Sequence, residues 1–185
     1  MKKIARGSHG YIGMSFDIGK PNRLIFCESV IDTMSYYQLH QKELADARLV
    51  SMEGLKQSVI AYQTLRLVAE EQEKLDFLDT LSPNHLNHYL SAIRDTTTYL
   101  QTHEGVLTLA VDNDEAGQGF CDKLLERGFP IEQDLPLLQG LKTKVDWNDW
   151  VKKQGEPSLR EVIDTAKKQI SQSHAPPRET PVFDL

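Results

Sequence analysis

Two aspartates, Asp112 and Asp114, stand directly behind an apolar, strand-like run over 106–111. Residues i and i+2 of an extended backbone project to the same side, so we expect the two carboxylates to converge. Two carboxylates that close repel each other unless one is protonated or a cation lies between them. Mg²⁺ prefers oxygen ligands and is commonly held by one or two carboxylates, with Mn²⁺ as an alternative. The spacing therefore predicts a divalent-metal site at the end of a strand.

The same segment, 112–114, has other possible functions besides a magnesium site. Asp and Asn are common in turns after strands, so 112–114 could be an ordinary turn. A calcium loop does not fit, because Ala116 occupies the fifth position and Lys123 the twelfth, where an acidic ligand is required. A phosphatase of the aspartyl-nucleophile type also uses Asp-x-Asp, but it requires Gly-Thr directly afterwards.

A further acid, Glu28, ends a second apolar run over 23–27. In parallel sheets functional groups collect beyond the carboxyl ends of the strands, so we expect Glu28 to join Asp112 and Asp114. Glu28 could instead cap the following helix, whose dipole stabilises acids at its N-terminus. Asp32, one turn into that helix, either reaches the metal through water or is a surface acid favoured by the dipole.

The segment 146–149 contains two more acids. Asp146 is either a metal ligand or a loop acid, and we expect Asp149 to cap the next turn. Trp147 and Trp150 could stack on a base, but packing against the sheet is the simpler use of both rings.

Lysines cluster around the same segment, at positions 142, 144, 152 and 153. Lys142 and Lys144 are candidate accessory residues that could contact phosphates. A solvated, charged surface is the alternative for the whole cluster.

The hydrophobic pattern predicts the elements that must position these residues. Strands are expected over 23–27, 48–52, 106–111 and, more weakly, 130–138. Helices are expected over 30–39, about 56–103 with a break at Ser82-Pro83, 116–127 ended by Gly128, and about 158–170. Strands that alternate with helices predict an α/β fold with about four mainly parallel strands flanked by helices.

Composition narrows the class of protein. The 185 residues suit one domain, and the net charge of −6 argues against a strongly basic, sequence-independent DNA binder. Cys27 and Cys121 cannot form a zinc quartet, and we expect both to be packed thiols in a cytoplasmic protein. No apolar run approaches the length of a membrane span, so we expect no membrane partner.

The order of these acids resembles the toprim domain, which primases, type IA and type II topoisomerases, OLD-type nucleases and recombination-repair proteins share. Glu28 with Asp32 behind one strand, and 112–117 behind another, are the residues that match. Within that superfamily the chain most resembles primase-like toprim proteins of plasmids and conjugative elements, the LtrC or TraC-like group. The segments that support this likeness are 7–16, 26–37, 51–55 and 146–149.

The resemblance implies a domain organisation and roles for the acids. A lead-in segment would cover 1–19, a Rossmann-like toprim domain 20–170 with a helical insertion at about 57–103, and a flexible tail 171–185. Toprim domains use the glutamate as a general acid or base, which points to Glu28, and hold Mg²⁺ with the aspartates, which points to Asp112 and Asp114.

Two positions depart from the primase pattern. Asp146 resembles a further acid that primases place after a glycine-lysine pair, but here Lys144-Val145 precedes it, so the lysine is shifted by one. Ser29 follows Glu28, as in type IA topoisomerases, where primases usually carry glycine.

The resemblance implies Mg²⁺-dependent nucleotidyl or phosphoryl transfer on DNA or RNA, most like that of a primase in plasmid or conjugative-element replication and transfer. The chain lacks a zinc module for template binding and a separate domain with a topoisomerase tyrosine, so a separate or upstream template-binding module is expected. A toprim nuclease is one alternative. A non-catalytic module that holds the metal and docks nucleic acid or a partner protein is the other.

Overall fold

The computed structural model describes residues 9–103, 105–137 and 144–155. The expected helix at 158–170, the expected tail at 171–185 and Lys142 lie outside these residues. The chain divides into two compact units, Met1–Val151 and Lys152–Leu185. The sheet and the candidate site belong to the first unit.

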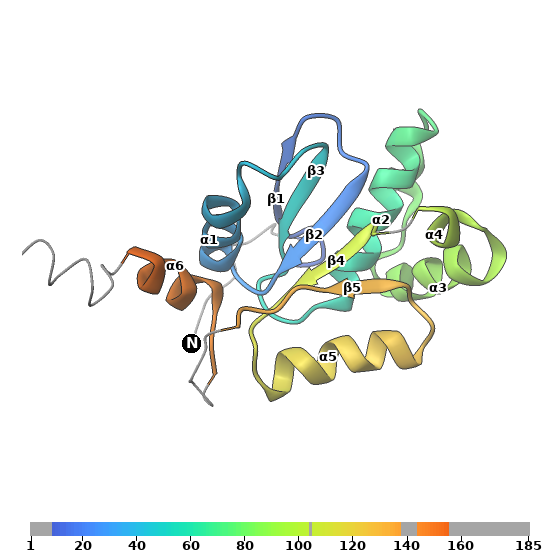
Figure 1. Ribbon diagram of the computed structural model, residues 1–185. Coiled ribbons are helices and arrows are strands. Elements are labelled where there is room, and N and C mark those ends of the chain that lie inside the picture. The colour runs from blue at the N-terminus through green and yellow to red at the C-terminus, as the bar shows by residue number, and fades with distance from the viewer. Residues whose placement is uncertain (1–8, 104, 138–143, 156–185) are drawn as a thin grey trace, which may run out of the picture. The chain divides into compact units, whose positions relative to one another are not determined.

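The first unit is built on a five-stranded sheet in the order β1-β3-β2-β4-β5 (Figure 1). The strands are β1 (Met14–Ile18), β2 (Arg23–Cys27), β3 (Ala47–Ser51), β4 (Leu107–Ala110) and β5 (Ile131–Gln133). Strands β3, β2, β4 and β5 run parallel to one another, and the edge strand β1 pairs antiparallel with β3. The predicted mixed α/β class and the four parallel strands are therefore confirmed. The edge strand β1 was not predicted; its residues fall in the expected lead-in segment 1–19.

Helices connect and flank these strands. They are α1 (Val30–His40), α2 (Gln57–Glu71), the 3₁₀ helices η1 (Leu75–Thr80) and η2 (Pro83–His85), α3 (Leu86–Thr96), α4 (Tyr99–Thr102), α5 (Glu115–Glu126) and α6 (Trp147–Gly155). Gly128 takes a φ of 78° just after α5, as its predicted C′ position requires.

The helical region between β3 and β4 is more broken than predicted. Only one break, at Ser82-Pro83, was expected, but α2 already ends at Glu71. Glu73 adopts a left-handed φ of 55°, and the amide of Lys74 returns to the carbonyl of Ala69 at 2.8 Å. This closing turn ends α2 in a polar stretch where no apolar stripe would hold a longer helix against the sheet.

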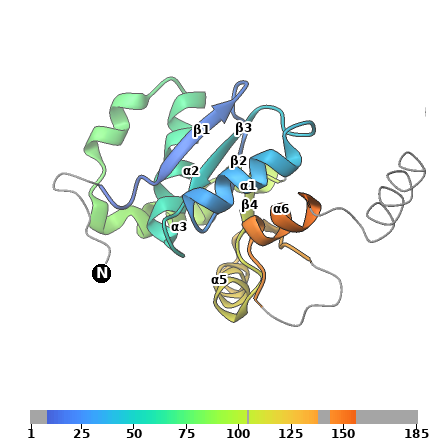
Figure 2. The ribbon, with the colours of Figure 1, turned by 90° about the vertical axis from the view of Figure 1, so that its left-hand side faces the viewer.

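Side chains of successive strand residues pack on opposite faces of the sheet. Leu24 and Phe26 of β2 join one core with residues of α2, α3 and α5, whereas Ile25 and Cys27 join a second core with Tyr36 of α1 and Trp147 of α6. Figure 2 shows α1 lying across its face of the sheet, with α2 behind. Both faces are thus covered, as expected for a parallel sheet.

Two predictions from composition concern the whole fold. Cys27 and Cys121 are free and buried, which confirms that both are packed thiols. Within the described ranges, every helix falls short of the length and apolar character that crossing a bilayer requires.

Candidate functional site

Strands β2 and β4 bring the predicted acids to one edge of the sheet. They are adjacent and parallel, and Cys27 pairs in register with Ala110. The chain therefore leaves β2 at Glu28 and β4 just before Asp112 at the same carboxyl edge, which confirms the expected convergence of the two strand ends. We call the carboxylates at this edge the acidic edge; it comprises Glu28, Asp32, Asp112, Asp114 and Asp146.

The two carboxylate oxygens of Asp114 make different contacts. It is the N-cap of α5, and its Oδ1 accepts a hydrogen bond from the amide of Gly117 at 2.8 Å. Its Oδ2 lies 2.9 Å from Nζ of Lys144. The helix cap holds the pKa of Asp114 below its ordinary value, and Lys144 acts in the same direction. Asp114 thus has a local structural role through Oδ1, while its Oδ2 is held by Lys144.

Lys144 reaches the acidic edge through an antiparallel bridge between Asn113 and Val145. The amide of Asn113 donates to the carbonyl of Val145 at 2.9 Å. Antiparallel pairing places Lys144 opposite Asp114 and Asp146 opposite Asp112. Lys144 Nζ lies 3.2 Å from Oδ2 of Asp112 as well as close to Asp114, so one ammonium bridges both carboxylates.

Asp112 is the most perturbed acid of the edge. Its pKa is raised to about 6, chiefly by burial, with the nearby charges of Asp32 and Glu28 contributing to the rise and Lys144 opposing it. Asp112 is only 6 % exposed, and its buried Oδ1 has no hydrogen-bond partner among the described residues. A buried carboxylate oxygen without a donor is costly unless a proton or a cation satisfies it.

Glu28 shows the same pattern at the end of the neighbouring strand. Burial raises its pKa, Lys144 opposes the shift, and the charges of Asp114 and Asp32 add to it. Its Oε2 is buried and lacks a partner within the described part of the chain. The amide of Gly54 donates to the Glu28 carbonyl at 2.8 Å, so the loop after β3 fixes the backbone here.

Ser29, and not Glu28, caps α1. Its backbone is extended at φ −128° and ψ 168°, and its hydroxyl oxygen accepts from the amide of Asp32 at 3.2 Å. The Ser29 hydroxyl in turn donates to Asp32 Oδ2 at 2.5 Å. The Ser29 hydroxyl thus bonds both the backbone amide and the carboxylate of Asp32, which closes the first turn of α1. The capping alternative for Glu28 is therefore wrong.

Asp32 is not a surface acid, as one alternative held. It is 6 % exposed, and burial raises its pKa, with the charge of Asp146 adding to the effect and Ser29 opposing it. Asp32 therefore faces the acidic edge from α1, although its hydrogen bonds show that it also serves the helix cap.

The segment after Val145 forms α6, an element that the sequence analysis did not predict. Asp146 Oδ1 accepts from the amide of Asp149 at 2.6 Å, so Asp146 caps this turn and the expected capping role of Asp149 is wrong. Trp147 is buried, and its Nε1 donates to the carbonyl of Ala110 at 2.9 Å. Core packing is thus confirmed for Trp147, which fixes Asp146 beside the end of β4.

The donor chemistry of the acidic edge suits a hard divalent cation. Among the described residues, Glu28 and Asp112 each keep a buried carboxylate oxygen without a hydrogen-bond donor, and carboxylate oxygens are the ligands that such an ion prefers. Across the described ranges, no three His, Cys, Asp or Glu side chains are already gathered in ligand geometry. Lys144 lies where a cation is needed, so its ammonium provides the local positive charge in this structure.

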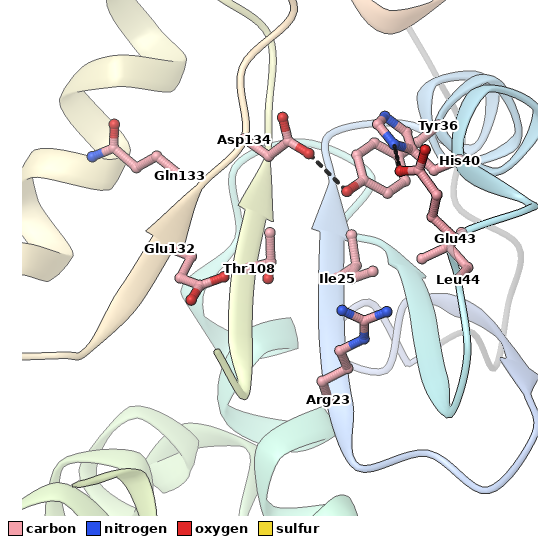
Figure 3. A pocket seen from close by; sticks show the side chains of 10 residues that line it. All are labelled: Arg23, Ile25, Tyr36, His40, Glu43, Leu44, Thr108, Glu132, Gln133 and Asp134. Atoms are coloured by element: carbon pink, nitrogen blue, oxygen red, sulfur yellow. Dashed lines mark hydrogen bonds and ion pairs between the residues drawn. The ribbon is translucent and has the colours of Figure 1, made fainter. Parts of the chain in front are cut away.

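A separate cavity of about 380 Å³ lies between α1 and strands β2, β4 and β5. Figure 3 shows Arg23, Tyr36 and Asp134 around it, with the Tyr36 hydroxyl donating to Asp134 Oδ2 at 2.7 Å and Gln133 turned away. Among the described residues that line it, none belongs to the acidic edge. This cavity was not anticipated, because its lining comes from four separate segments of the sequence.

Comparison with known proteins gives one informative match. The chain is 29% identical over 160 residues, 82% of its length, to pXO2-78, an uncharacterized protein of Bacillus anthracis. The chain spans only 38% of the length of that relative. No family model matches the chain, and no solved structure matches it.

Proposed function

We propose that the chain is a toprim-type catalytic module that performs Mg²⁺-dependent nucleotidyl transfer on nucleic acid, most like a primase of a plasmid or conjugative element. The observation that carries the proposal is the pair of buried, unpartnered carboxylate oxygens on Glu28 and Asp112, at the ends of two adjacent parallel strands. A buried carboxylate with a purely structural role normally accepts hydrogen bonds. The two unpartnered oxygens of Glu28 and Asp112 therefore favour a functional role.

Asp112 and Asp114 are the residues that would hold the metal, with Asp146 brought beside Asp112 by the antiparallel bridge. When bound, Mg²⁺ or Mn²⁺ supplies charge neutralisation for phosphate oxygens. The capped helix α5 holds Asp114 by one oxygen and leaves the other directed to the site. Positioning and electrostatics supply most of the rate in phosphoryl transfer, and this rigid placement provides both.

Glu28 is the residue that would move the proton. In strand extension a 3′-hydroxyl oxygen bonds to the α-phosphorus of a nucleoside triphosphate, the bond to the β-phosphate oxygen breaks, and pyrophosphate leaves. The hydroxyl proton passes to Glu28. Burial raises the pKa of Glu28 above its ordinary value, which makes its carboxylate a stronger base for this proton.

The polymer must be bound largely by surfaces outside the acidic edge. The net charge is −6, and among the described residues the edge carries five carboxylates, of which Lys144 pairs with two. Neutralisation of several phosphates by Lys and Arg is what gives nucleic-acid binding its strength. We therefore propose that a separate template-binding module cooperates with this chain. The match to a relative of greater length is consistent with such a partner.

The test is a template-directed extension assay with single-stranded DNA, labelled nucleotides and either Mg²⁺ or Mn²⁺. Wild type is compared with Asp112→Asn, Glu28→Gln and the control Asp122→Asn, an exposed acid on α5. We expect a loss of roughly 10²- to 10⁴-fold in the first two variants and full activity in the control. Shortened rather than extended products would identify a nuclease. Equal activity in wild type and Asp112→Asn would refute the catalytic assignment.

The bridging position of Lys144 favours a second candidate, a non-catalytic module. With its ammonium already bridging Asp112 and Asp114, Lys144 would make the acidic edge a structural docking surface that needs no metal. This candidate expects salt-dependent binding to single-stranded DNA without turnover under any combination of metal and nucleotide. Turnover by the chain, lost in Glu28→Gln, would eliminate it.

A further inference from the structure

We propose that Lys144 is a tethered counter-ion that competes with the metal for Asp112 and Asp114 and, once displaced, binds a phosphate of the nucleic acid. Metal and nucleic acid would then bind cooperatively. This inference rests on the metal site of the proposed function, although it does not depend on which reaction follows.

The first support is the position of the ammonium. Nζ of Lys144 lies 2.9 Å from Oδ2 of Asp114 and 3.2 Å from Oδ2 of Asp112. On Asp114, Oδ2 is the oxygen left for a metal ion, because Oδ1 accepts from the amide of Gly117, and Lys144 already holds that Oδ2. Lys144 and a metal ion therefore cannot both hold their full contacts to the pair.

The second support is that the side chain can leave while its backbone stays. The Asn113–Val145 bridge and the buried Val145 fix the residue that follows Lys144. The Lys144 side chain itself is 59 % exposed, so its tip can turn into solvent without opening the core. The lysine end of the pair is solvated, so the ammonium regains its hydration when it leaves, and a divalent ion in its place keeps the buried Asp112 compensated.

The third support is that the ammonium does not satisfy the site. Oδ1 of Asp112 and Oε2 of Glu28 remain without donors although Lys144 is close by. The Lys144 ammonium therefore leaves part of the acidic edge unsatisfied, and it lies where phosphates of the nucleic acid would approach. Because coupling between two ligands is reciprocal, nucleic acid that captures Lys144 must strengthen metal binding by the same factor.

The first experiment measures Mn²⁺ affinity in the absence of nucleic acid, by the loss of the free-ion electron paramagnetic resonance signal. Lys144→Met should bind Mn²⁺ roughly threefold to tenfold more tightly than wild type, the range that a weak ion pair implies. Lys123→Met, an exposed lysine on α5, is the matched control and should bind as wild type does. Asp112→Asn should lose binding.

The second experiment measures the salt dependence of binding to single-stranded oligothymidylate, with and without Mg²⁺. Each lysine–phosphate contact adds about 0.7 to the slope of log affinity against log salt for single strands. With Mg²⁺ the slope of Lys144→Met should be lower than that of wild type by about this amount. Without Mg²⁺ the two slopes should agree, because Lys144 is still held by the aspartates.

The outcomes separate this inference from the proposed function. If Asp112→Asn and wild type bind Mn²⁺ alike, the metal site is wrong and both ideas fail. If Asp112→Asn loses the ion but Lys144→Met binds it no more tightly than wild type, only the counter-ion role fails. Slopes that differ equally with and without Mg²⁺ would show a permanent phosphate contact and would also overturn the exchange.

Discussion

The α-carbon of Gly117 packs directly against the backbone carbonyl of Asp112. A β-carbon at position 117 would overlap that carbonyl oxygen and would also lie 3.2 Å from Cγ2 of Val111. The first turn of α5 is therefore packed on the very residues that carry the acidic edge. This contact, together with the cap from Asp114 to the Gly117 amide, couples the geometry of the aspartates to the placement of the helix.

Gly117→Ala should both destabilise the protein and disturb the site. The added methyl group forces a backbone shift, for which about 1 to 3 kcal/mol is typical, and the shift moves Asp112. Gly119 offers the matched control, because a β-carbon there meets nothing within 4 Å. Gly119→Ala should stabilise the helix by up to about 1 kcal/mol. Urea unfolding and Mn²⁺ titration of both variants check this, and equal effects of the two substitutions would contradict it.

Asp112→Asn should stabilise the metal-free protein above pH 6. The pKa of Asp112 is raised to about 6 in the folded state, against an ordinary value of 3.8. Well below pH 3.8 the carboxyl is protonated in both states and imposes no cost. Between pH 3.8 and 6 the cost of ionising it in the folded state grows, and above pH 6 it is complete. The shift, which already includes the opposing effect of Lys144, corresponds to about 3 kcal/mol.

The measurement is the free energy of unfolding of wild type and Asp112→Asn from about pH 3 to about pH 8 in the presence of EDTA. The difference should be near zero at about pH 3 and should reach its plateau above about pH 6. Added Mg²⁺ should reverse the order, because it stabilises only the protein that binds it. A difference that does not change with pH would show that Asp112 is not perturbed.

The strands that carry the acids could be predicted because they are buried on both faces. Such strands read as continuous apolar runs, and each run here ends abruptly in an acid. The edge strand β1 could not be recognised in this way. It is half exposed, and Asp17 within it is explained only by its cross-strand partner Arg48. Its sequence therefore resembles a loop until the partner strand is known.

The acids of the site were predictable, but their partners were not. Spacing alone indicates that Asp112 and Asp114 share one side of the backbone. The bridge between Asn113 and Val145, which delivers Lys144, leaves no periodic signal in either segment. Asp146 was predicted to be either a metal ligand or a loop acid. Its role in capping α6 was not predicted, because the sequence pattern pointed to Asp149 as the cap.

Trp147→Phe should weaken the protein and the metal site together. The indole Nε1 donates to Ala110, the last residue of β4, and the ring lies edge-on to Tyr36 at 4.8 Å between centroids. Phenylalanine leaves the carbonyl without its donor and a gap in the core, at a cost of about 2 to 4 kcal/mol. Because α6 loses its anchor, Asp146 also loses its position, and Mn²⁺ affinity should fall.

Trp150→Phe is the control for this change. Trp150 is only partly buried, so the substitution should cost less than about 1 kcal/mol and leave Mn²⁺ binding unchanged. Each variant retains a single tryptophan, which makes the emission spectrum informative. The protein with only Trp147 should emit at shorter wavelength than the protein with only Trp150. Identical spectra would contradict the burial of Trp147.

Arg48→Met should destabilise the packing of the edge strand β1 against the rest of the sheet. Arg48 is 1 % exposed, and its guanidinium donates to Asp17 of β1 from Nε at 2.6 Å and to Glu70 of α2 from Nη2 at 2.9 Å. Removing one partner of such a network leaves the others uncompensated, so we expect a loss of about 3 kcal/mol in urea unfolding. Arg23→Met on the adjacent strand β2, where no guanidinium network of this kind is present in the described residues, should cost less than about 1 kcal/mol.

The pH dependence of that loss identifies its origin. Arg48 holds the pKa of Asp17 below its ordinary value of 3.8, so the ion pair stabilises the fold above that pH and the stabilisation fades as the pH falls through the lowered pKa. The difference between wild type and Arg48→Met should therefore shrink below pH 4. A difference that persists unchanged at pH 3 would mean that Arg48 acts through the packing of its aliphatic part, and the ionic account of the edge strand would be wrong.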